Sequence, residues 1–153
     1  MSKFLIIGYG NPLRGDDGLG WQAVERLSDL YKEGGVRCMR CHQLTPELAV
    51  PISEAEQVAF IDAAHGREPG HIRQEELDPA PSGPVVWGHV MSPNTLLTYS
   101  KHLYGACPKA RIFSVGAESF EIGERISDRV AAAIPTLIWL IQQWLGKPTK
   151  EVA

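Results

Sequence analysis

Two adjacent carboxylates stand in a glycine-rich turn near the start of the chain. Asp16 and Asp17 lie within residues 8–18, GYGNPLRGDDG, directly after the apolar run 4–7. A turn of this kind at the end of a buried strand usually binds phosphate through backbone N–H groups. Here the acidic pair would repel a phosphate, and Leu13 stands where a dinucleotide fingerprint needs its third glycine. We expect one of the two carboxylates to cap the following helix, and because a cap needs only one, the other remains for a cation site.

A further carboxylate, Asp62, ends the predicted strand 57–62, QVAFID. Because the carboxyl ends of parallel strands meet at one edge of a sheet, we expect Asp62 to lie near the acidic pair. The alternative is a hydrogen-bonded set of carboxylates with no metal. Either His65 or His89, both in predicted loops, would add an imidazole, and such a mixed set suits zinc or nickel. The remaining histidines are less well placed for a site: His42, His71 and His102.

The stretch 38–42, CMRCH, matches the pattern by which c-type haem is attached. The same residues, however, look like a strand that follows Gly34 and Gly35. Positions three apart on a strand point to opposite faces of the sheet. We therefore expect the thiols of Cys38 and Cys41 to lie apart, and we predict no haem, metal or redox use for them.

The bulk properties are those of an ordinary globular domain. The 153 residues are 44% hydrophobic and 22% charged, with a formal net charge of -3. This acidic balance argues against nucleic acid or an anionic membrane as the main partner. No segment has the roughly 20 consecutive apolar residues of a membrane span. A strand expected from about Lys3 leaves no room for a signal peptide, and the expected location is the cytoplasm.

Strand and helix patterns alternate along most of the chain. This alternation predicts a three-layer α/β/α fold with a mostly parallel, roughly five-stranded twisted sheet flanked by helices. We expect one domain over residues 1–146 and a frayed tail over 147–153. In the helix opened by Ser92 and Pro93, we expect an apolar face that includes Leu96, Leu97, Ser100, Leu103 and Tyr104. The expected strands are 3–8, 36–42, 57–62, 71–76 and 110–116, and the expected helices are 18–32, a short one from Thr45, 92–104 and 127–146.

Several of these motifs together resemble the nickel-iron hydrogenase maturation proteases. They are residues 8–20 (GYGNPLRGDDGLG), 60–63 (FIDA), 114–116 (SVG) and the later Gly123. The resemblance spans nearly the whole chain. It implies a cytoplasmic endopeptidase that removes a C-terminal extension from the large-subunit precursor of a hydrogenase after nickel has been inserted. The nickel would be supplied by the substrate, and another divalent ion is an alternative occupant in crystals.

Family members bind metal through an acidic residue of the first motif, an aspartate at the end of the central strand and a histidine near the third helix. Carried over, the resemblance implies Asp17, Asp62 and His89 as metal ligands. In the better-known members the histidine follows a Ser-Pro-like helix start, a place that Asn94 takes in this chain. We choose His89, because imidazole is a better nickel ligand than a carboxamide.

The remaining expectations concern catalysis and substrate contacts. The expected catalytic residues are Asp17, Asp62 and Asp16, with either member of the acidic pair as the general base. A non-enzymatic metal- or nucleotide-binding module of the same architecture is the alternative, because a fold does not determine a function. The residues expected to contact the substrate are Gly10, Asn11, Gln43, Thr45 and Asn94.

Overall fold

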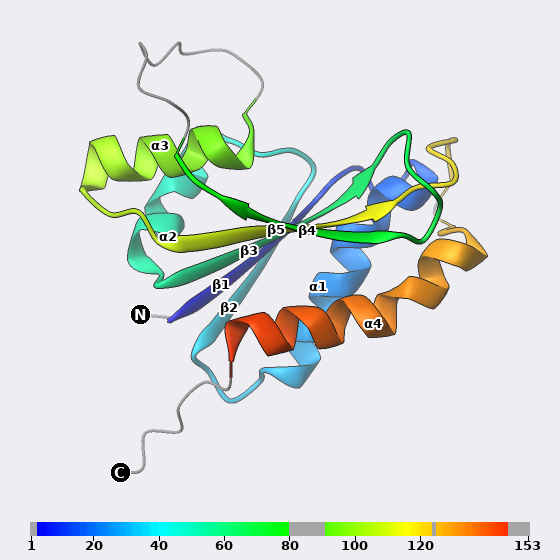
Figure 1. Cartoon of the computed structure of the whole chain (residues 1–153), viewed down its shortest axis with the longest axis horizontal. Helices are drawn as coiled ribbons and strands as arrows, with labels where there is room; N and C mark the ends of the chain where they lie inside the picture. The colour runs from blue at the N-terminus through cyan, green and yellow to red at the C-terminus, as the bar shows by residue number, and fades with distance from the viewer. Residues whose placement is uncertain (1–2, 80–90, 124, 147–153) are drawn as a thin grey trace.

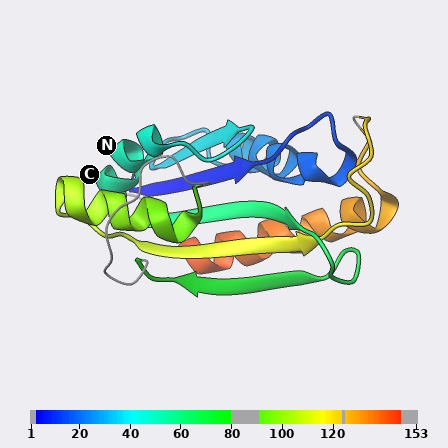
Figure 2. The same ribbon diagram turned by 90° about the horizontal axis from the view of Figure 1, so that it is seen from above.

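A five-stranded sheet forms the centre of the molecule. The computed structural model describes residues 3–79, 91–123 and 125–146. The strand order is β2-β1-β3-β5-β4; β4 at one edge runs antiparallel to β5, and the other pairs are parallel (Figure 2). The predicted α/β fold with a mostly parallel sheet is confirmed. The strands are β1 (Phe4–Tyr9), β2 (Val36–Cys41), β3 (Gln57–Ala64), β4 (Ile72–Leu77) and β5 (Lys109–Gly116).

Helices cover both faces of this sheet, as Figure 1 shows. Helices α1 and α4 pack on one face, and α2 and α3 pack on the other. The helices are α1 (Leu19–Leu30), α2 (Ala49–Glu54), α3 (Pro93–Tyr104) and α4 (Asp128–Leu145), with short 3-10 helices η1 (Gly15–Gly18) and η2 (Pro46–Leu48). The predicted tail 147–153 lies outside the described residues, and the domain limits stay a prediction.

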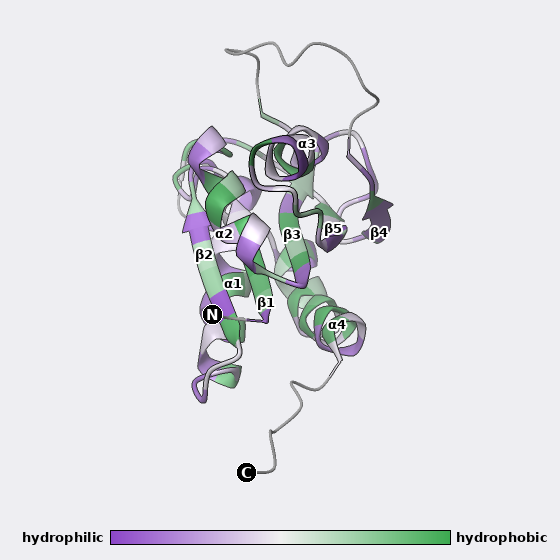
Figure 3. Cartoon of the chain, turned by 90° about the vertical axis from the view of Figure 1, so that its left-hand side faces the viewer, coloured by the Kyte–Doolittle hydropathy of each residue, from purple (hydrophilic) through white to green (hydrophobic). Residues whose placement is uncertain are grey.

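The core consists of two layers because side chains alternate along each strand. On β1, Phe4 and Ile6 face α1 and α4, whereas Leu5 and Ile7 face α2 and α3. The central strands are therefore apolar on both faces, which is typical of a covered parallel sheet. The edge strand β4 is hydrophilic by comparison, as Figure 3 shows beside the mainly hydrophobic β1.

Helix α3 begins and ends where the sequence predicts. Ser92 Oγ accepts a hydrogen bond from the backbone N–H of Thr95, and Gly105 ends the helix with a φ of 69°. The predicted apolar face is wrong in its last turn, because Leu103 and Tyr104 are 56% and 52% exposed. The buried part of α3 ends at Ser100, so its last turn extends beyond the layer it covers.

The two cysteines of the CMRCH stretch lie on opposite faces of β2. Cys38 packs against the core layer of α1 and α4, and Cys41 packs against the layer of α2 and α3. Both thiols are free, and burial raises the pKa of Cys38 to about 11. The prediction that they do not converge is confirmed.

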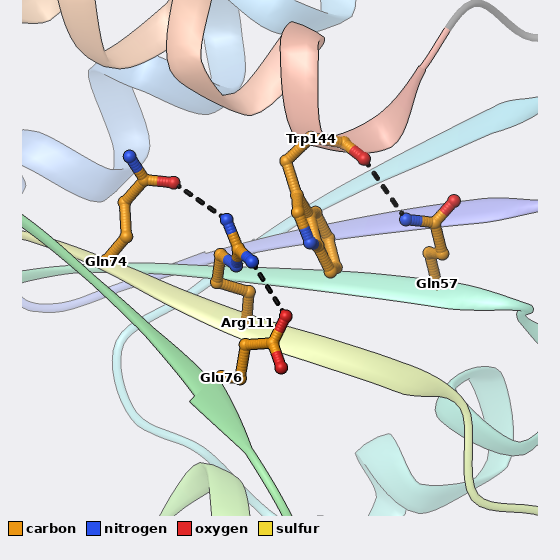
Figure 4. A network of polar contacts seen from close by, with 5 residues as sticks. All are labelled: Gln57, Gln74, Glu76, Arg111 and Trp144. Atoms are coloured by element: carbon orange, nitrogen blue, oxygen red, sulfur yellow. Dashed lines mark hydrogen bonds and ion pairs between the residues drawn. The ribbon is translucent and has the colours of Figure 1, made fainter.

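A polar network fastens the end of α4 to the sheet (Figure 4). Arg111 on β5 donates to Gln74 at 3.0 Å and to Glu76 at 2.8 Å, and its guanidinium lies 5.4 Å from the centroid of the Trp144 ring. Gln57 on β3 donates to the backbone carbonyl of Trp144 at 3.3 Å. The network thereby joins α4 to three strands at once.

Candidate functional site

The loop after β1 brings Asp17 back against the strand end. Gly10 has a φ of 142°, and a Cβ at this position would lie 2.1 Å from the backbone oxygen of Asp17. Only glycine fits this close approach of two backbone segments. The N–H of Asn11 donates to Asp17 Oδ2 at 2.7 Å, which orients the carboxylate. The glycine-rich turn thus presents an acid, as the sequence predicts.

Asp62 lies near the carboxyl end of β3 and on the α2 and α3 side of the sheet, where Phe60 also points. The Tyr9 hydroxyl donates to Asp62 Oδ2 at 2.8 Å. The other oxygen, Oδ1, is buried and has no hydrogen-bond partner among the described residues. A buried carboxylate oxygen without a partner is costly, so this atom is able to accept a bond from, or coordinate, a ligand.

The electrostatics of this pair of acids favour a bound cation. The pKa of Asp62 is raised to about 6, chiefly by burial and also by the charge of Asp17, while the Tyr9 hydrogen bond and the charge of Arg67 act in the opposite direction. Burial, together with the charge of Asp62, also raises the pKa of Tyr9, so its hydroxyl remains a donor. A divalent cation bound between the two carboxyl groups would favour the ionised form of both. The donor set is oxygen-rich and fits such an ion as a partial ligand shell.

Asp16, in contrast, holds the surrounding loops together. Its side chain is 1% exposed. Oδ2 accepts from the N–H groups of Glu118 and Ser119 and from the hydroxyl of Ser127, and Oδ1 accepts from the N–H of Ser127 at 2.7 Å. Burial would raise the pKa of Asp16, but these donors outweigh it and the pKa is lowered. The prediction that one of the pair caps the following helix is wrong, because Gly18 occupies the N-cap of α1 and no side chain caps it.

Two loops far apart in the sequence pair beside this site. The N–H of Gly15 donates to the carbonyl of Gly123 at 2.8 Å, and the N–H of Gly123 donates to the carbonyl of Leu13 at 2.7 Å. These bonds and the bridge between Arg14 and Gly123 join the loop after β1 to the segment after β5 (Figure 2). The pairing places Gly123 directly against residues 13–15 of the first motif.

Two further residues of the site were missed by the sequence analysis, Tyr9 and Arg67. Tyr9 lies inside the quoted motif, and its position at the end of β1 opposite β3 was the available signal. Arg67 donates through Nη1 to Ser114 Oγ at 2.7 Å and acts on Asp62 through its charge. Its position in a loop offered no comparable signal.

Of the other predicted site residues, Gln43, Thr45 and His65 follow strands at the carboxyl edge of the parallel sheet, whereas Asn94, in the first turn of α3, lies toward the amino end of β5. Gln43 is exposed and Thr45 is half-buried in the segment after β2. Asn94 donates through its amide to the carbonyl of Asp78 at 2.8 Å. His65 is exposed and stacks on Phe120, with ring centroids 5.5 Å apart.

His89 lies outside the described residues, so its place in the site stays a prediction. Within the residues that the structure does describe, no group of three or more His, Cys, Asp or Glu side chains is arranged to hold a metal ion. In the same part of the chain, no helix combines the length and the apolar character needed to cross a membrane.

Comparison with known proteins identifies a class for this fold and site. No protein-family model matches the chain, and no curated protein sequence matches it. Among solved structures, the nickel-iron hydrogenase maturation protease HycI from Thermococcus kodakarensis matches with a TM-score of 0.74 and 27% identity, over 94% of this chain and 92% of that chain. The hydrogenase maturating endopeptidase HybD from E. coli matches with a TM-score of 0.76 and 21% identity, over 95% and 92% of the two chains.

The class is therefore that of small α/β proteins with an acidic site at the carboxyl edge of the sheet. More particularly, the chain has the fold of the nickel-iron hydrogenase maturation proteases over nearly its whole length. The resemblance inferred from the sequence motifs is confirmed.

Proposed function

We propose that this chain is an endopeptidase that removes a C-terminal extension from the nickel-loaded large-subunit precursor of a nickel-iron hydrogenase. The similarity to the maturation proteases supports the reaction class. The observation that carries the proposal to this chain is the buried, unpartnered Oδ1 of Asp62 beside the charge of Asp17. We further propose that the enzyme acts in the cytoplasm, without nucleic acid or membrane as a partner.

The nickel belongs to the substrate and serves to recognise it. Asp17 and Asp62 would contribute oxygen ligands, and His89 would contribute a nitrogen. A divalent ion in this position also polarises a nearby carbonyl or water. Because the ion is fixed in the precursor, its docking brings the scissile peptide bond to the acids, and proximity supplies part of the rate.

We assign the general base to Asp17 rather than to Asp16. A general base needs a lone pair that can reach the attacking water. The oxygens of Asp16 accept bonds from four donors of residues 118, 119 and 127, whereas Asp17 Oδ2 accepts one backbone N–H. Asp16 would therefore hold the loop that positions Asp17.

The substrate's tail would contact the residues around the acids. Gly10 and Asn11 place backbone next to Asp17, which allows an extended peptide to approach closely. Gln43 and Thr45 would line the same approach from the segment after β2, and Asn94, in the first turn of α3, would contact the tail farther from the acids.

The test is processing of a purified large-subunit precursor that still carries its extension. Nickel-loaded precursor should be shortened by the wild-type chain, and nickel-free precursor should remain intact. Asp17→Ala, Asp62→Ala and His89→Ala should each lose cleavage by roughly 100-fold or more. Asp29→Asn is the matched control, because Asp29 lies on the exposed surface of α1 in an ion pair with Lys32 at 3.8 Å.

Full cleavage by all three site variants would overturn the proposed roles. The competing binding module is tested by thermal unfolding with NAD, ATP, nickel or zinc. A stabilising shift with a nucleotide and no cleavage of the precursor would favour that module and refute the endopeptidase.

A further inference from the structure

The guanidinium of Arg67 is placed beside Asp62 by a neutral hydroxyl. Arg67 Nη1 donates to Ser114 Oγ at 2.7 Å, and Ser114 is the β5 residue paired with Asp62 in the sheet. The charge of Arg67 acts on Asp62, yet no ion pair joins these two described side chains. An arginine that served only to neutralise a carboxylate would form a short bidentate pair with it.

The backbone of Arg67 is also held in place. A Cβ on Gly116 would lie 2.1 Å from the carbonyl oxygen of Glu68 and 3.3 Å from the Cβ of Arg67. The loop is fixed to the end of β5 by hydrogen bonds of 2.8 Å from Gly70 to Gly116 and from Gly116 to His71. The motif at 114–116 therefore positions Arg67 in two ways. The hydroxyl of Ser114 accepts a hydrogen bond from its guanidinium, and the absence of a side chain at Gly116 allows the backbone of residues 67–68 to pack closely.

This arrangement leaves hydrogen-bond donors for a substrate. A guanidinium has five N–H donors, and the bond to Ser114 uses one of them. Asp62 has Tyr9 on its β1 side and Arg67 on its β5 side, so a peptide bond brought to the acids would meet a cation on the β5 side. Hydrolysis of a peptide bond places negative charge on its carbonyl oxygen, and fixed donors stabilise that charge.

We infer that Arg67 is a catalytic residue that donates hydrogen bonds to the carbonyl oxygen of the scissile peptide bond, with Ser114 as its positioning residue, an inference that rests on the endopeptidase function proposed above. Water adds to the carbonyl carbon, and the π electrons of the carbonyl move to its oxygen beside Arg67. The general base accepts the proton of the water. When the carbonyl re-forms, the C–N bond breaks and the leaving nitrogen takes up that proton.

The experiment measures kcat and KM for cleavage of the nickel-loaded precursor. Arg67→Gln should lower kcat by roughly 100-fold while KM changes less than about 3-fold, because the contact is made chiefly in the transition state. Arg67→Lys should recover part of the loss, since it retains a charge but not the planar fork. Ser114→Ala should lower kcat by roughly 10-fold, and Ser114→Thr, which keeps the hydroxyl, should restore it.

The matched control is Arg73→Gln. Arg73 is exposed and faces Ser114 across the β4–β5 pair, so its removal changes the local charge by the same amount without touching the anchored guanidinium. Its kcat should stay within about 2-fold of wild type. Circular dichroism and thermal unfolding establish that each variant is folded.

The outcomes separate the two proposals. Unchanged kcat in folded Arg67→Gln, a loss confined to KM, or equal losses in Arg67→Gln and Arg73→Gln would overturn the role of Arg67 and leave the endopeptidase standing. No cleavage by the wild-type chain would overturn both.

Discussion

Replacing Asp62 with asparagine should make the protein more stable at neutral pH while it abolishes cleavage. The pKa of Asp62 is raised from 3.8 to about 6, chiefly by burial, so keeping the carboxylate ionised above that pH lowers the stability of the folded protein. Asparagine removes the charge, and its amide oxygen can accept the 2.8 Å bond from Tyr9. The proposed role of Asp62 as a metal ligand needs this charge, so the charge would be retained at a cost in stability.

The magnitude follows from the shift. About two pKa units at 1.36 kcal/mol each correspond to about 3 kcal/mol at about pH 7.5. Partial exposure of the side chain, and an amide nitrogen placed where Oδ1 lacks a partner, reduce the expected gain to about 1–3 kcal/mol. A carboxylate with a raised pKa favours the folded state at low pH, and this contribution is lost as the pH rises through about 6. The advantage of the variant should therefore shrink to about 1 kcal/mol or less near pH 4.5.

Urea unfolding of both proteins from about pH 4.5 to about pH 8 measures this difference directly. Asp29→Asn is again the control, because this exposed aspartate should change stability by less than about 0.5 kcal/mol with little dependence on pH. An Asp62→Asn variant that is no more stable than wild type at about pH 7.5, or whose advantage does not depend on pH, would refute the reasoning.

Three further predictions concern the supports of the site. Asp16→Asn should destabilise the fold by about 2–4 kcal/mol in urea unfolding, because the NH2 group of asparagine would face buried N–H donors that now bind a carboxylate oxygen. The loss should diminish at acid pH, because the wild-type carboxylate also becomes protonated once the pH falls to its lowered pKa. Tyr9→Phe should raise the pKa of Asp62 further, measured by NMR titration of its carboxyl carbon; an unchanged or lower pKa would contradict the role of the hydroxyl. Gly116→Ala should cost more than about 2 kcal/mol in thermal unfolding, since its Cβ would lie 2.1 Å from the Glu68 carbonyl oxygen, and an unaffected melting temperature would count against this packing.

Much of the fold was accessible from the sequence because its signals are local. Apolar runs predicted the buried strands, and Ser92 and Gly105 correctly marked the ends of α3. The spacing of Cys38 and Cys41 on a strand was enough to place them on opposite faces. The last turn of α3 shows the limit of such signals. A helical period indicates which residues share a face, but it does not indicate where the covered layer ends, and Leu103 and Tyr104 are exposed.

By itself, the sequence determined that acids stand at or near the carboxyl ends of two buried strands, since the order of strands and turns is written along the chain. Only the tertiary structure decided what each acid contacts. The partners of Asp16 lie 102 to 111 residues further along the chain, and Tyr9 meets Asp62 across 53 residues. Adjacent aspartates have the same local chemistry, so the difference between Asp16 and Asp17 arises from the donors that folding brings to each. Arg67 follows the same rule, because Ser114 comes from a strand that reaches it only when the sheet has formed.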